Sequence, residues 1–360
     1  MHVFLSVNVV ATIKAGIIGE RGAGKTTLFR ALTGLVSSAG YPGEKQRARV
    51  GQIKVPDSRL DFLAAIYQSQ KKVQVEISLL DFAPASVDKH GKGVLDGGLM
   101  PMLRELDALL IVIPGFREPP PKVADVLEGI ETELILADVD QAERRLTRIK
   151  KERGPNEFER TTLEKCLDWL NSGRPLRTLE LSTQEAKAIS HFCFLSRKPA
   201  LGVLNYQAQA PDEAELANHD DKIEAQGLEV LPIDALFEAE LWELEPAQRL
   251  ELLKEAGLNR SARERLIEAL YHRLQLITFY TAGPKEARAW TLSGKSTALD
   301  AAGQIHSDMA RGFIRAEVIS FGDMERFKSE AGVREAGKLR LESRDYIVQD
   351  GDIIRIRFKT

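Results

Sequence analysis

Eight consecutive residues near the start of the chain have the types and spacing of a phosphate-binding loop: Gly19-Glu20-Arg21-Gly22-Ala23-Gly24-Lys25-Thr26. Glycines let successive backbone N–H groups turn toward one phosphate, and a helix that starts at the loop adds its dipole. Lys25 would neutralise the outer phosphates, and the Thr26 hydroxyl is a ligand for Mg²⁺. With Thr27, these residues are the predicted binding site for a nucleoside triphosphate, ATP or GTP, with Mg²⁺.

The loop stands between two elements that would position it. The apolar run at 15–18 precedes it and predicts a buried strand, and residues 28–32 open a helix. Further apolar strands are expected at 73–80, 108–113 and 200–204, separated by helical stretches. Continuous apolar strands that alternate with helices are typical of a parallel sheet covered on both faces. The sequence therefore predicts an α/β nucleotide domain.

Length and composition set the broad class of protein. The chain has 360 residues with 43% hydrophobic content, which is enough for two or three domains. Cys166 and Cys193 are too far apart in sequence for a disulfide framework or a Cys-x-x-Cys metal site, so we expect core thiols in a cytoplasmic protein. No stretch reaches the ~20 apolar residues that cross a membrane. Residues 1–10 lack a basic start, which favours a short extension or edge strand over a signal peptide.

Residues 126–151 carry apolar side chains at spacings of four and three, which predicts a long helix with a heptad seam. Gly154-Pro155 would end this helix, and a second one follows with an apolar face and a stop at 171–173. Two such helices make an antiparallel hairpin; an ordinary amphipathic pair packed on the sheet is the alternative. The seam residues are Ile135, Val139, Ala142, Leu146 and Ile149, and the second helix presents Leu163, Cys166, Leu167 and Leu170.

The hairpin is expected as an insertion within the nucleotide domain rather than an appendage. Ser182-Thr183-Gln184-Glu185 is a capping box that starts another helix after it. The strand expected at 200–204 then continues the sheet.

From about Gly283 the sequence becomes rich in predicted strand, at 312–319 and again at 345–352. Asp350-Gly351 is typical of a two-residue β-hairpin turn. The last strand, 354–359, alternates apolar residues with Arg or Lys, so one face is expected to be buried and the other basic. These patterns predict a small, separate α+β domain.

Several longer motifs follow one another in a fixed order. They are Tyr41-Pro42, Val55-Pro56-Asp57-Ser58-Arg59-Leu60, Glu131-Thr132-Glu133-Leu134, Glu238-Ala239-Glu240-Leu241, Leu276-Ile277-Thr278-Phe279, Ala287-Arg288-Ala289-Trp290-Thr291, Ala301-Ala302-Gly303-Gln304-Ile305-His306, 311–319, Glu335-Ala336-Gly337-Lys338-Leu339-Arg340-Leu341 and Val348-Gln349-Asp350-Gly351-Asp352. Over essentially the whole chain they resemble a known family, the YchF/Obg-like ATPases of the Obg-related class of P-loop proteins. The stretch from 287 onward looks like that family's TGS domain, a β-grasp module.

The resemblance implies both fold and function. The implied fold class is α/β: a P-loop GTPase-like parallel sheet with an inserted antiparallel helical hairpin and a C-terminal β-grasp (TGS, α+β) domain. The expected boundaries are 1–127 and 183–278 for the NTPase domain, 128–182 for the hairpin and 279–360 for the TGS domain. The implied function is binding and slow hydrolysis of ATP, more than GTP, in association with ribosomes. The alternative is a degenerate NTPase that binds ribosomes or RNA and uses nucleotide only as a structural ligand.

The second switch departs from the GTPase-like pattern. There, an Asp-x-x-Gly turn aims a glycine N–H at the γ-phosphate, but this chain has Asp81-Phe82-Ala83-Pro84. Proline has no N–H, so Pro84 cannot make that contact. Asp81 can still orient the water shell of Mg²⁺, as a Walker B carboxylate does. Thr26 and Asp81 are therefore the predicted metal residues.

The first switch also lacks an expected residue, because 43–50 contain no Ser or Thr that could close over Mg²⁺. Lys45, Arg47 and Arg49 either approach phosphate oxygens as cations or belong to a solvated loop. Neither interpretation restores the metal ligand.

Base recognition is altered as well. Guanine is usually read by a carboxylate that follows an asparagine; here Asn205 is retained, but the carboxylate position is Ala208. Guanine would keep unsatisfied donors at a cost of ~1–3 kcal/mol, which favours ATP. Asn205, Ala235 and Leu236 are the predicted contacts on the base and sugar side. Asp234 and Leu236 stand where the family has Ser and Lys, which leaves base stacking open.

The residue that would position or deprotonate water is not evident from the sequence. At the position where the family has a histidine, this chain has Ile111. His90 is a weak candidate for a catalytic base, and a mobile surface histidine is the alternative. We therefore expect slow turnover or none.

Partners are predicted from local charge, because the net charge of −3 gives no general attraction to nucleic acid. Residues 140–178 hold ten Lys and Arg against seven Asp and Glu, and residues 281–360 hold fourteen against twelve. Such patches can contact phosphate backbones without reading bases, although basic helix ends are also common for dipole reasons. With the resemblance, they predict a ribosome or structured RNA as partner through hairpin and TGS domain, with no DNA sequence readout, no membrane and a monomeric state. The basic residues at the hairpin are Arg144, Arg145, Arg148, Lys150, Lys151 and Arg153.

Overall fold

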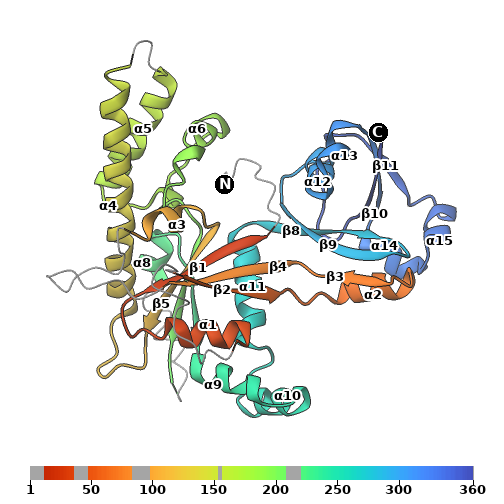
Figure 1. Cartoon of the computed structure of the whole chain (residues 1–360), viewed down its shortest axis with the longest axis horizontal. Coiled ribbons are helices and arrows are strands. Elements are labelled where there is room, and N and C mark those ends of the chain that lie inside the picture. The colour runs from red at the N-terminus through yellow and green to blue at the C-terminus, as the bar shows by residue number, and fades with distance from the viewer. Residues whose placement is uncertain (1–11, 36–47, 83–97, 153–155, 208–219, 360) are drawn as a thin grey trace. The chain divides into compact units, whose positions relative to one another are not determined.

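The computed structural model describes residues 12–35, 48–82, 98–152, 156–207 and 220–359 (Figure 1). The chain forms two compact units, each with its own sheet. The first unit is built mainly from Lys14–Ile53 and Ser78–Arg273, and the second from Lys54–Ile77 and Leu274–Thr360. In the described residues, no helix combines the length and apolar character needed to cross a membrane.

The sheet of the first unit has six strands in the order β2-β4-β1-β5-β6-β7. The pairs β1–β5, β5–β6 and β6–β7 are parallel, which confirms the predicted α/β class with a parallel sheet. Every residue of β5 is buried, as expected for a strand covered on both faces. The strands are β1 (Ile13–Gly19), β2 (Ala48–Lys54), β4 (Glu76–Phe82), β5 (Ala108–Pro114), β6 (Ala200–Asn205) and β7 (Val230–Ile233).

The helices of this unit begin at recognisable caps. Ser182 and Glu185 form the predicted capping box at the start of the helix Thr183–Ala188. Asp234 accepts a hydrogen bond from Phe237 N at the start of the helix Ala235–Glu240. The helices are α1 (Lys25–Thr33), α3 (Met100–Arg104), α4 (Val123–Ile149), α5 (Glu157–Asn171), α6 (Thr183–Ala188), α8 (Asp220–Ala225), α9 (Ala235–Glu240), α10 (Pro246–Glu255) and α11 (Ala262–Arg273), with short 3-10 turns at Leu176–Thr178, Ser190–Phe192 and Leu241–Glu243.

Helix α4 is 27 residues long and contributes to two hydrophobic cores. Its first half packs with β5 and β6 through residues up to Leu134. From Ile135 onward its apolar side chains pack instead against α5, along which it runs (Figure 1). The predicted seam residues belong to this second core, and Gly173 ends α5 with a φ of 75°. A buried ion pair, Arg177 Nη1 to Glu131 Oε1 at 2.8 Å, joins α4 to the segment that returns from α5.

The second unit contains a mixed sheet in the order β11-β10-β12-β8-β9-β3. Strands β8 and β12 are parallel, and β8–β9 and β10–β12 are antiparallel, which is the strand pattern of a β-grasp module. The strands are β3 (Lys71–Val73), β8 (Leu276–Ala282), β9 (Glu286–Ser293), β10 (Phe313–Ile319), β11 (Arg340–Glu342) and β12 (Ile353–Phe358). Four helices belong to it: α12 (Ala298–Ile305), α13 (Ser307–Arg311), α14 (Phe321–Phe327) and α15 (Glu330–Glu335).

A segment from the first third of the chain completes this second unit. The sequence boundaries put residues 54–77 in the nucleotide domain, yet here they supply α2 (Ser58–Ile66) and the edge strand β3. Leu60 and Leu63 are fully buried against one face of the sheet, together with α14 and α15, while α12 covers the other face. Ser69 Oγ donates to Gly283 O at 2.7 Å, and β3 pairs with β9.

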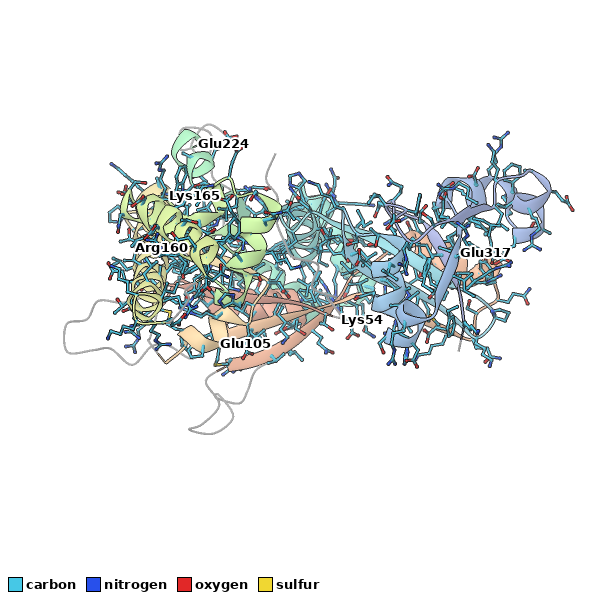
Figure 2. All side chains as sticks on the ribbon, turned by 90° about the horizontal axis from the view of Figure 1, so that it is seen from above. Lys54, Glu105, Arg160, Lys165, Glu224 and Glu317 are labelled. Atoms are coloured by element: carbon cyan, nitrogen blue, oxygen red, sulfur yellow. The ribbon has the colours of Figure 1, made fainter. Side chains whose placement is uncertain are left out.

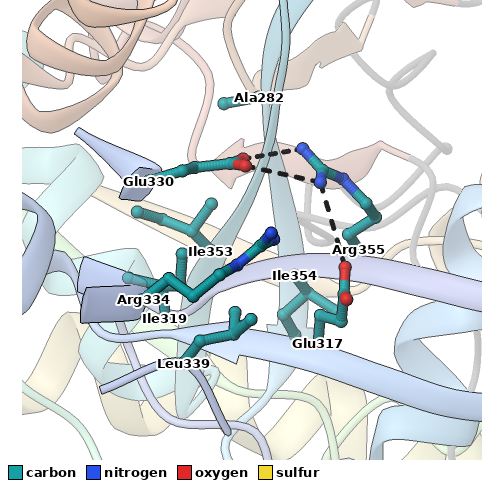
Figure 3. Close-up of a pocket in the computed structure, with 9 residues that line it drawn as sticks. All are labelled: Ala282, Glu317, Ile319, Glu330, Arg334, Leu339, Ile353, Ile354 and Arg355. Carbon is teal, nitrogen blue, oxygen red and sulfur yellow. Dashed lines mark hydrogen bonds and ion pairs between the residues drawn. The ribbon is translucent and has the colours of Figure 1, made fainter. Parts of the chain in front are cut away.

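Two expectations for the second unit are wrong. Residues 345–352 form turns with one isolated bridge rather than a strand, and Asp350-Gly351 makes no hairpin. Instead, Asp350 Oδ1 accepts from Thr278 N at 2.8 Å, and Gly351 N donates to Thr278 O, so the turn is bound along the side of β8. The basic face of β12 is largely neutralised: Figure 3 shows Arg355 between the carboxylates of Glu330, at 2.6 Å, and Glu317, at 3.9 Å.

One cysteine also differs from its expectation. Cys166 is a buried thiol in the α4–α5 core, where burial raises its pKa to about 12. Cys193 is exposed, because it has a φ of 49° at the end of a 3-10 turn and points away from that core.

Candidate functional site

The phosphate-binding loop leaves β1 at Gly19 and enters α1 at Lys25. Three of its glycines have positive φ angles, Gly19 at 145°, Gly22 at 76° and Gly24 at 90°. Only glycine adopts this region freely. At Gly24 an added Cβ atom would lie 2.1 Å from Asn205 Nδ2, so a larger residue would displace Asn205.

The Lys25 side chain lies across the loop. Its Nζ donates to Gly19 O at 2.6 Å and to Glu20 O at 2.7 Å. Burial lowers the pKa of Lys25, while the carboxylates of Asp81 and Glu20 oppose that shift. A phosphate would offer charged oxygens in place of neutral carbonyls, and charge-assisted hydrogen bonds are the stronger kind. Lys25 is therefore placed to give up its hydrogen bonds to the loop carbonyl groups and to donate to a phosphate instead.

Two side chains from neighbouring strand ends hold the loop. Asn205 Nδ2, at the end of β6, donates to Ala23 O at 3.1 Å. Arg117, after β5, donates from Nη2 to Arg21 O at 3.0 Å and from Nη1 to Glu20 Oε2 at 2.6 Å. These contacts satisfy outward carbonyl groups of the loop and fix its shape.

The two predicted metal residues lie side by side. Thr26 Oγ1 donates to Asp81 Oδ2 at 3.0 Å, and Asp81 is fully buried at the end of β4. A hydroxyl and a carboxylate next to a phosphate loop fit Mg²⁺, which takes few protein ligands and completes its shell with water and phosphate oxygens. Elsewhere, the described residues contain no cluster of three or more His, Cys, Asp or Glu that could hold a metal.

The predicted base and sugar side is assembled around Asn205. Its Oδ1 accepts from Ala235 N at 3.2 Å, so one buried side chain joins the phosphate loop to the loop that starts α9. Leu236 follows with 45% of its surface exposed. Thr27 lies in the first turn of α1, beside the loop. The structure thus brings together all the predicted binding residues that it describes.

Sequence reasoning missed Phe116 and Arg117. Phe116 is 40% exposed, and its ring lies 3.7 Å from the Cβ position of Gly24. Both residues lie in the turn that follows β5. Ligands of parallel sheets bind at the carboxyl ends of strands, so this position was a general signal, although it does not single out either residue. An exposed aromatic ring here can stack on a base.

His90, Pro84, Ala208, Lys45 and Arg47 lie outside the described residues. Ile111 is fully buried within β5 and packs in the core of the sheet.

The cations of the hairpin differ in how they are paired. Arg144 and Arg148 are exposed and four residues apart near the end of α4, which places them on one face. Lys151, just beyond the helix, is also exposed. Arg160 and Lys165 lie on α5 (Figure 2). Both contact acidic neighbours. The pairs are Arg160 with Glu157 and Glu164, Lys165 with Glu185, Arg145 with Glu152 and Glu159, and, in an exposed i,i+4 contact, Arg144 with Asp140.

Comparisons with known proteins agree along the whole length of the chain. The family model YchF-GTPase_C, described as a protein of unknown function, matches residues 276–359. A protein of Escherichia coli O157:H7 named ribosome-binding ATPase YchF is 39% identical over 96% of this chain and 99% of its own. The protein of the same name from Bacillus subtilis is 36% identical with the same coverage.

The solved structure of the Schizosaccharomyces pombe YchF GTPase superposes with a TM-score of 0.78 at 26% identity, covering 96% of this chain and 98% of that one. The sequence matches and this fold together identify the protein as a member of the YchF family.

Proposed function

We propose that this chain is a nucleotide-binding protein of the cytoplasm that binds ATP with Mg²⁺, hydrolyses it slowly and associates with ribosomes. The observation that carries the proposal is the loop itself. Lys25 and the Thr26–Asp81 pair stand at one end of a parallel sheet, on a loop held by Asn205. The names of the relatives, ribosome-binding ATPase, agree with this chemistry.

The residues divide the work of binding. Lys25 would leave the carbonyl groups of Gly19 and Glu20 and donate to the outer phosphates. Thr26 and Asp81 would hold Mg²⁺, which neutralises charge on the phosphates. Asn205 keeps the loop in its shape throughout, because its contacts are to backbone groups on both sides.

We propose ATP rather than GTP as the preferred nucleotide. The guanine-reading carboxylate position is Ala208. Phe116 and Leu236 instead offer exposed apolar surface near Asn205 and Ala235, which suits a base held by stacking. His90 stays a weak candidate for the water-positioning base.

We propose that the hairpin carries the ribosome-binding surface. Its support is the exposed cations Arg144, Arg148 and Lys151. Arg144 contacts only Asp140, one turn away on the same helix, whereas Lys165 and Arg355 are held by carboxylates of other elements. Phosphate contacts of this kind give affinity without base readout. We retain the four-part domain division, the TGS contact with RNA and the monomeric state as parts of this proposal.

The degenerate alternative is favoured by Pro84, by the lack of Ser and Thr at 43–50 and by Ala208 at the base-reading position. Pro84 has no N–H for a γ-phosphate. If the protein does not distinguish ATP from ADP, the nucleotide is a structural ligand and the chain is a binding module.

Calorimetric titration with ATP, ADP and GTP in Mg²⁺, followed by single-turnover phosphate release with and without ribosomes, tests the function. We expect ATP to bind more tightly than GTP and phosphate to be released slowly. Equal binding of ATP and ADP with no release under either condition would establish the binding module, and no nucleotide binding would contradict both readings.

Ribosome cosedimentation tests the surface separately. Replacing Arg144, Arg148 and Lys151 by Gln should weaken binding at 50 mM salt by about tenfold or more, since each lost phosphate contact reduces affinity. The matched control replaces Arg160 and Lys165 by Gln, because these cations are paired within the protein. Equal losses in the two variants would exclude the α4 face as the contact.

A further inference from the structure

The end of α3 is packed onto both strands that carry the proposed nucleotide ligands. Gly16 lies on β1, just before the phosphate loop, and a Cβ atom there would meet Leu106 Cδ1 at 2.3 Å and Phe82 Cε2 at 3.0 Å. Leu106 directly follows α3, and Phe82 directly follows Asp81 on β4. Phe82 and Leu106 are both buried in one hydrophobic core. A shift of β1 or β4 would therefore displace the end of α3, because close-packed cores transmit displacement.

Arg104, the last residue of α3, joins this end to the hairpin helix. Its Nη1 donates to Asp138 Oδ1 at 3.2 Å, and its Nη2 donates to Ala137 O at 3.3 Å. Nη1 also donates to Cys193 O at 3.3 Å. Lys198 fixes the backbone at this point, with Nζ donating to Arg104 O at 2.9 Å. The guanidinium fork thus spans α4 and the segment that returns from the hairpin.

Asp138 is a fully buried carboxylate on α4. It accepts from Leu195 N at 2.9 Å, from Ser196 N at 2.7 Å and from Ser196 Oγ at 2.8 Å. It stands where α4 passes from one core to the other, since Leu134 packs with the sheet and Ile135 with the hairpin. A contact at this point acts on the first turn of the hairpin half.

We propose that Arg104 is a positioning residue that couples nucleotide binding at the phosphate loop to the α4–α5 hairpin. The coupling path runs through Phe82 and Leu106 to Arg104 and from there to Asp138. The proposal rests on the proposed function, because it requires that the loop binds nucleotide. It gives the cationic face of α4 a means of responding to the nucleotide site.

Hydrogen exchange on the full-length chain, with and without Mg·ATP, tests this coupling. In the wild type, we expect slower exchange in residues 19–33 and a changed rate in the hairpin, residues 139–152 and 156–171. In Arg104→Gln the response of residues 19–33 should persist and that of the hairpin should be lost. Arg104→Lys should also lose it, because one ammonium group keeps a charge beside Asp138 but cannot reproduce the fork.

Arg144→Gln is the matched control. Arg144 lies on α4, as Asp138 does, and is also paired with a carboxylate, yet its partner, Asp140, is exposed one turn away on the same helix. Its hairpin response should match the wild type. Arg104→Lys keeps the test valid if Arg104→Gln does not fold.

Two results would overturn the coupling. One is a hairpin response that survives in Arg104→Lys, and the other is a wild-type response confined to residues 19–33, which would leave the proposed function intact. If residues 19–33 themselves do not respond to Mg·ATP in the wild type, the proposed function fails and the coupling fails with it.

Discussion

At the scale of single residues, the three loop glycines have the same backbone requirement but different surroundings. Gly22 and Gly24 both have positive φ angles. Around Gly22 there is nothing within 4 Å of an added Cβ atom, whereas at Gly24 the space is filled by Asn205. One substitution therefore tests backbone strain alone, and the other tests strain together with the Asn205 bridge.

Gly24→Ala should destabilise the protein more than Gly22→Ala. In both variants, a non-glycine residue in the left-handed region lowers the free energy of unfolding by about 1–2 kcal/mol. Gly24→Ala also displaces Asn205 from buried hydrogen bonds to Ala23 and Ala235, which adds about 1–3 kcal/mol. Urea unfolding measures both free energies. Equal losses in the two variants would show that Asn205 does not brace the loop.

The parts of this site that depend on residues close together in sequence could be predicted, whereas the parts that depend on the order of the strands could not. The loop, Thr26, Asp81 and Asn205 follow from residue types at strand ends, and the structure brings them together. Phe116 and Arg117 were missed because an aromatic residue and an arginine in a loop carry no local signature. Their contact with the loop depends on the order of strands in the sheet, which the residue pattern does not specify.

At the scale of elements, α4 is one helix with two packing partners. Its seam predicted a helical hairpin because the spacing of four and three continues past Ile135. The sequence did not show that the first half packs on the sheet, since apolar residues at helical spacing do not name their partner. Glu159, on α5, is a carboxylate with only 7% of its surface exposed. It accepts a hydrogen bond from Arg145 Nε of α4 at 2.7 Å, which joins the two hairpin helices.

Glu159→Gln should weaken the hairpin at neutral pH and flatten its pH dependence. The hydrogen bonds from Arg145 lower the pKa of Glu159 below its ordinary value of 4.5. Because the pKa of Glu159 is lower in the folded state than in the unfolded state, ionised Glu159 stabilises the folded protein at pH values above 4.5. This contribution is lost as the pH falls through the folded-state pKa. A hydrogen bond to a charged group contributes about 1.5–3 kcal/mol.

Hydrogen exchange in residues 156–171, measured from pH 7 to pH 4, checks this prediction. Glu164→Gln is the control, because Glu164 is 43% exposed in an i,i+4 pair with Arg160. The account is wrong if the wild type and Glu159→Gln lose protection in parallel as the pH falls.

At the scale of the whole molecule, residues 54–77 belong to a different compact unit from the residues that precede and follow them in sequence. Residues 54–77 leave the nucleotide sheet after β2, supply α2 and β3 to the second unit, and return as β4. Leu60 and Leu63 of α2 are fully buried, but apolar residues in a helix do not show against which sheet they pack. Contacts between segments this far apart in sequence have no local signal.

Leu63→Ala should therefore loosen the second unit, although residue 63 stands between strands of the first. Removing a fully buried leucine costs about 2–5 kcal/mol. Exchange of the β8 and β9 amides should become faster, while β5 in the first unit stays protected. Asp61→Ala, which removes an exposed pair with Lys72, should cost about 0–1 kcal/mol. Faster exchange in β5 with β9 unchanged would contradict this assignment.

The central claim is that the loop at 19–26 binds the phosphates of a nucleotide through Lys25. Calorimetric titration of Lys25→Ala with Mg·ATP tests it most directly, with Lys14→Ala, which replaces an exposed lysine on β1, as control. Loss of a charge-assisted contact of about 1.5–3 kcal/mol should weaken binding by about 10- to 100-fold in Lys25→Ala and leave Lys14→Ala unchanged. Wild-type affinity in Lys25→Ala would contradict the claim.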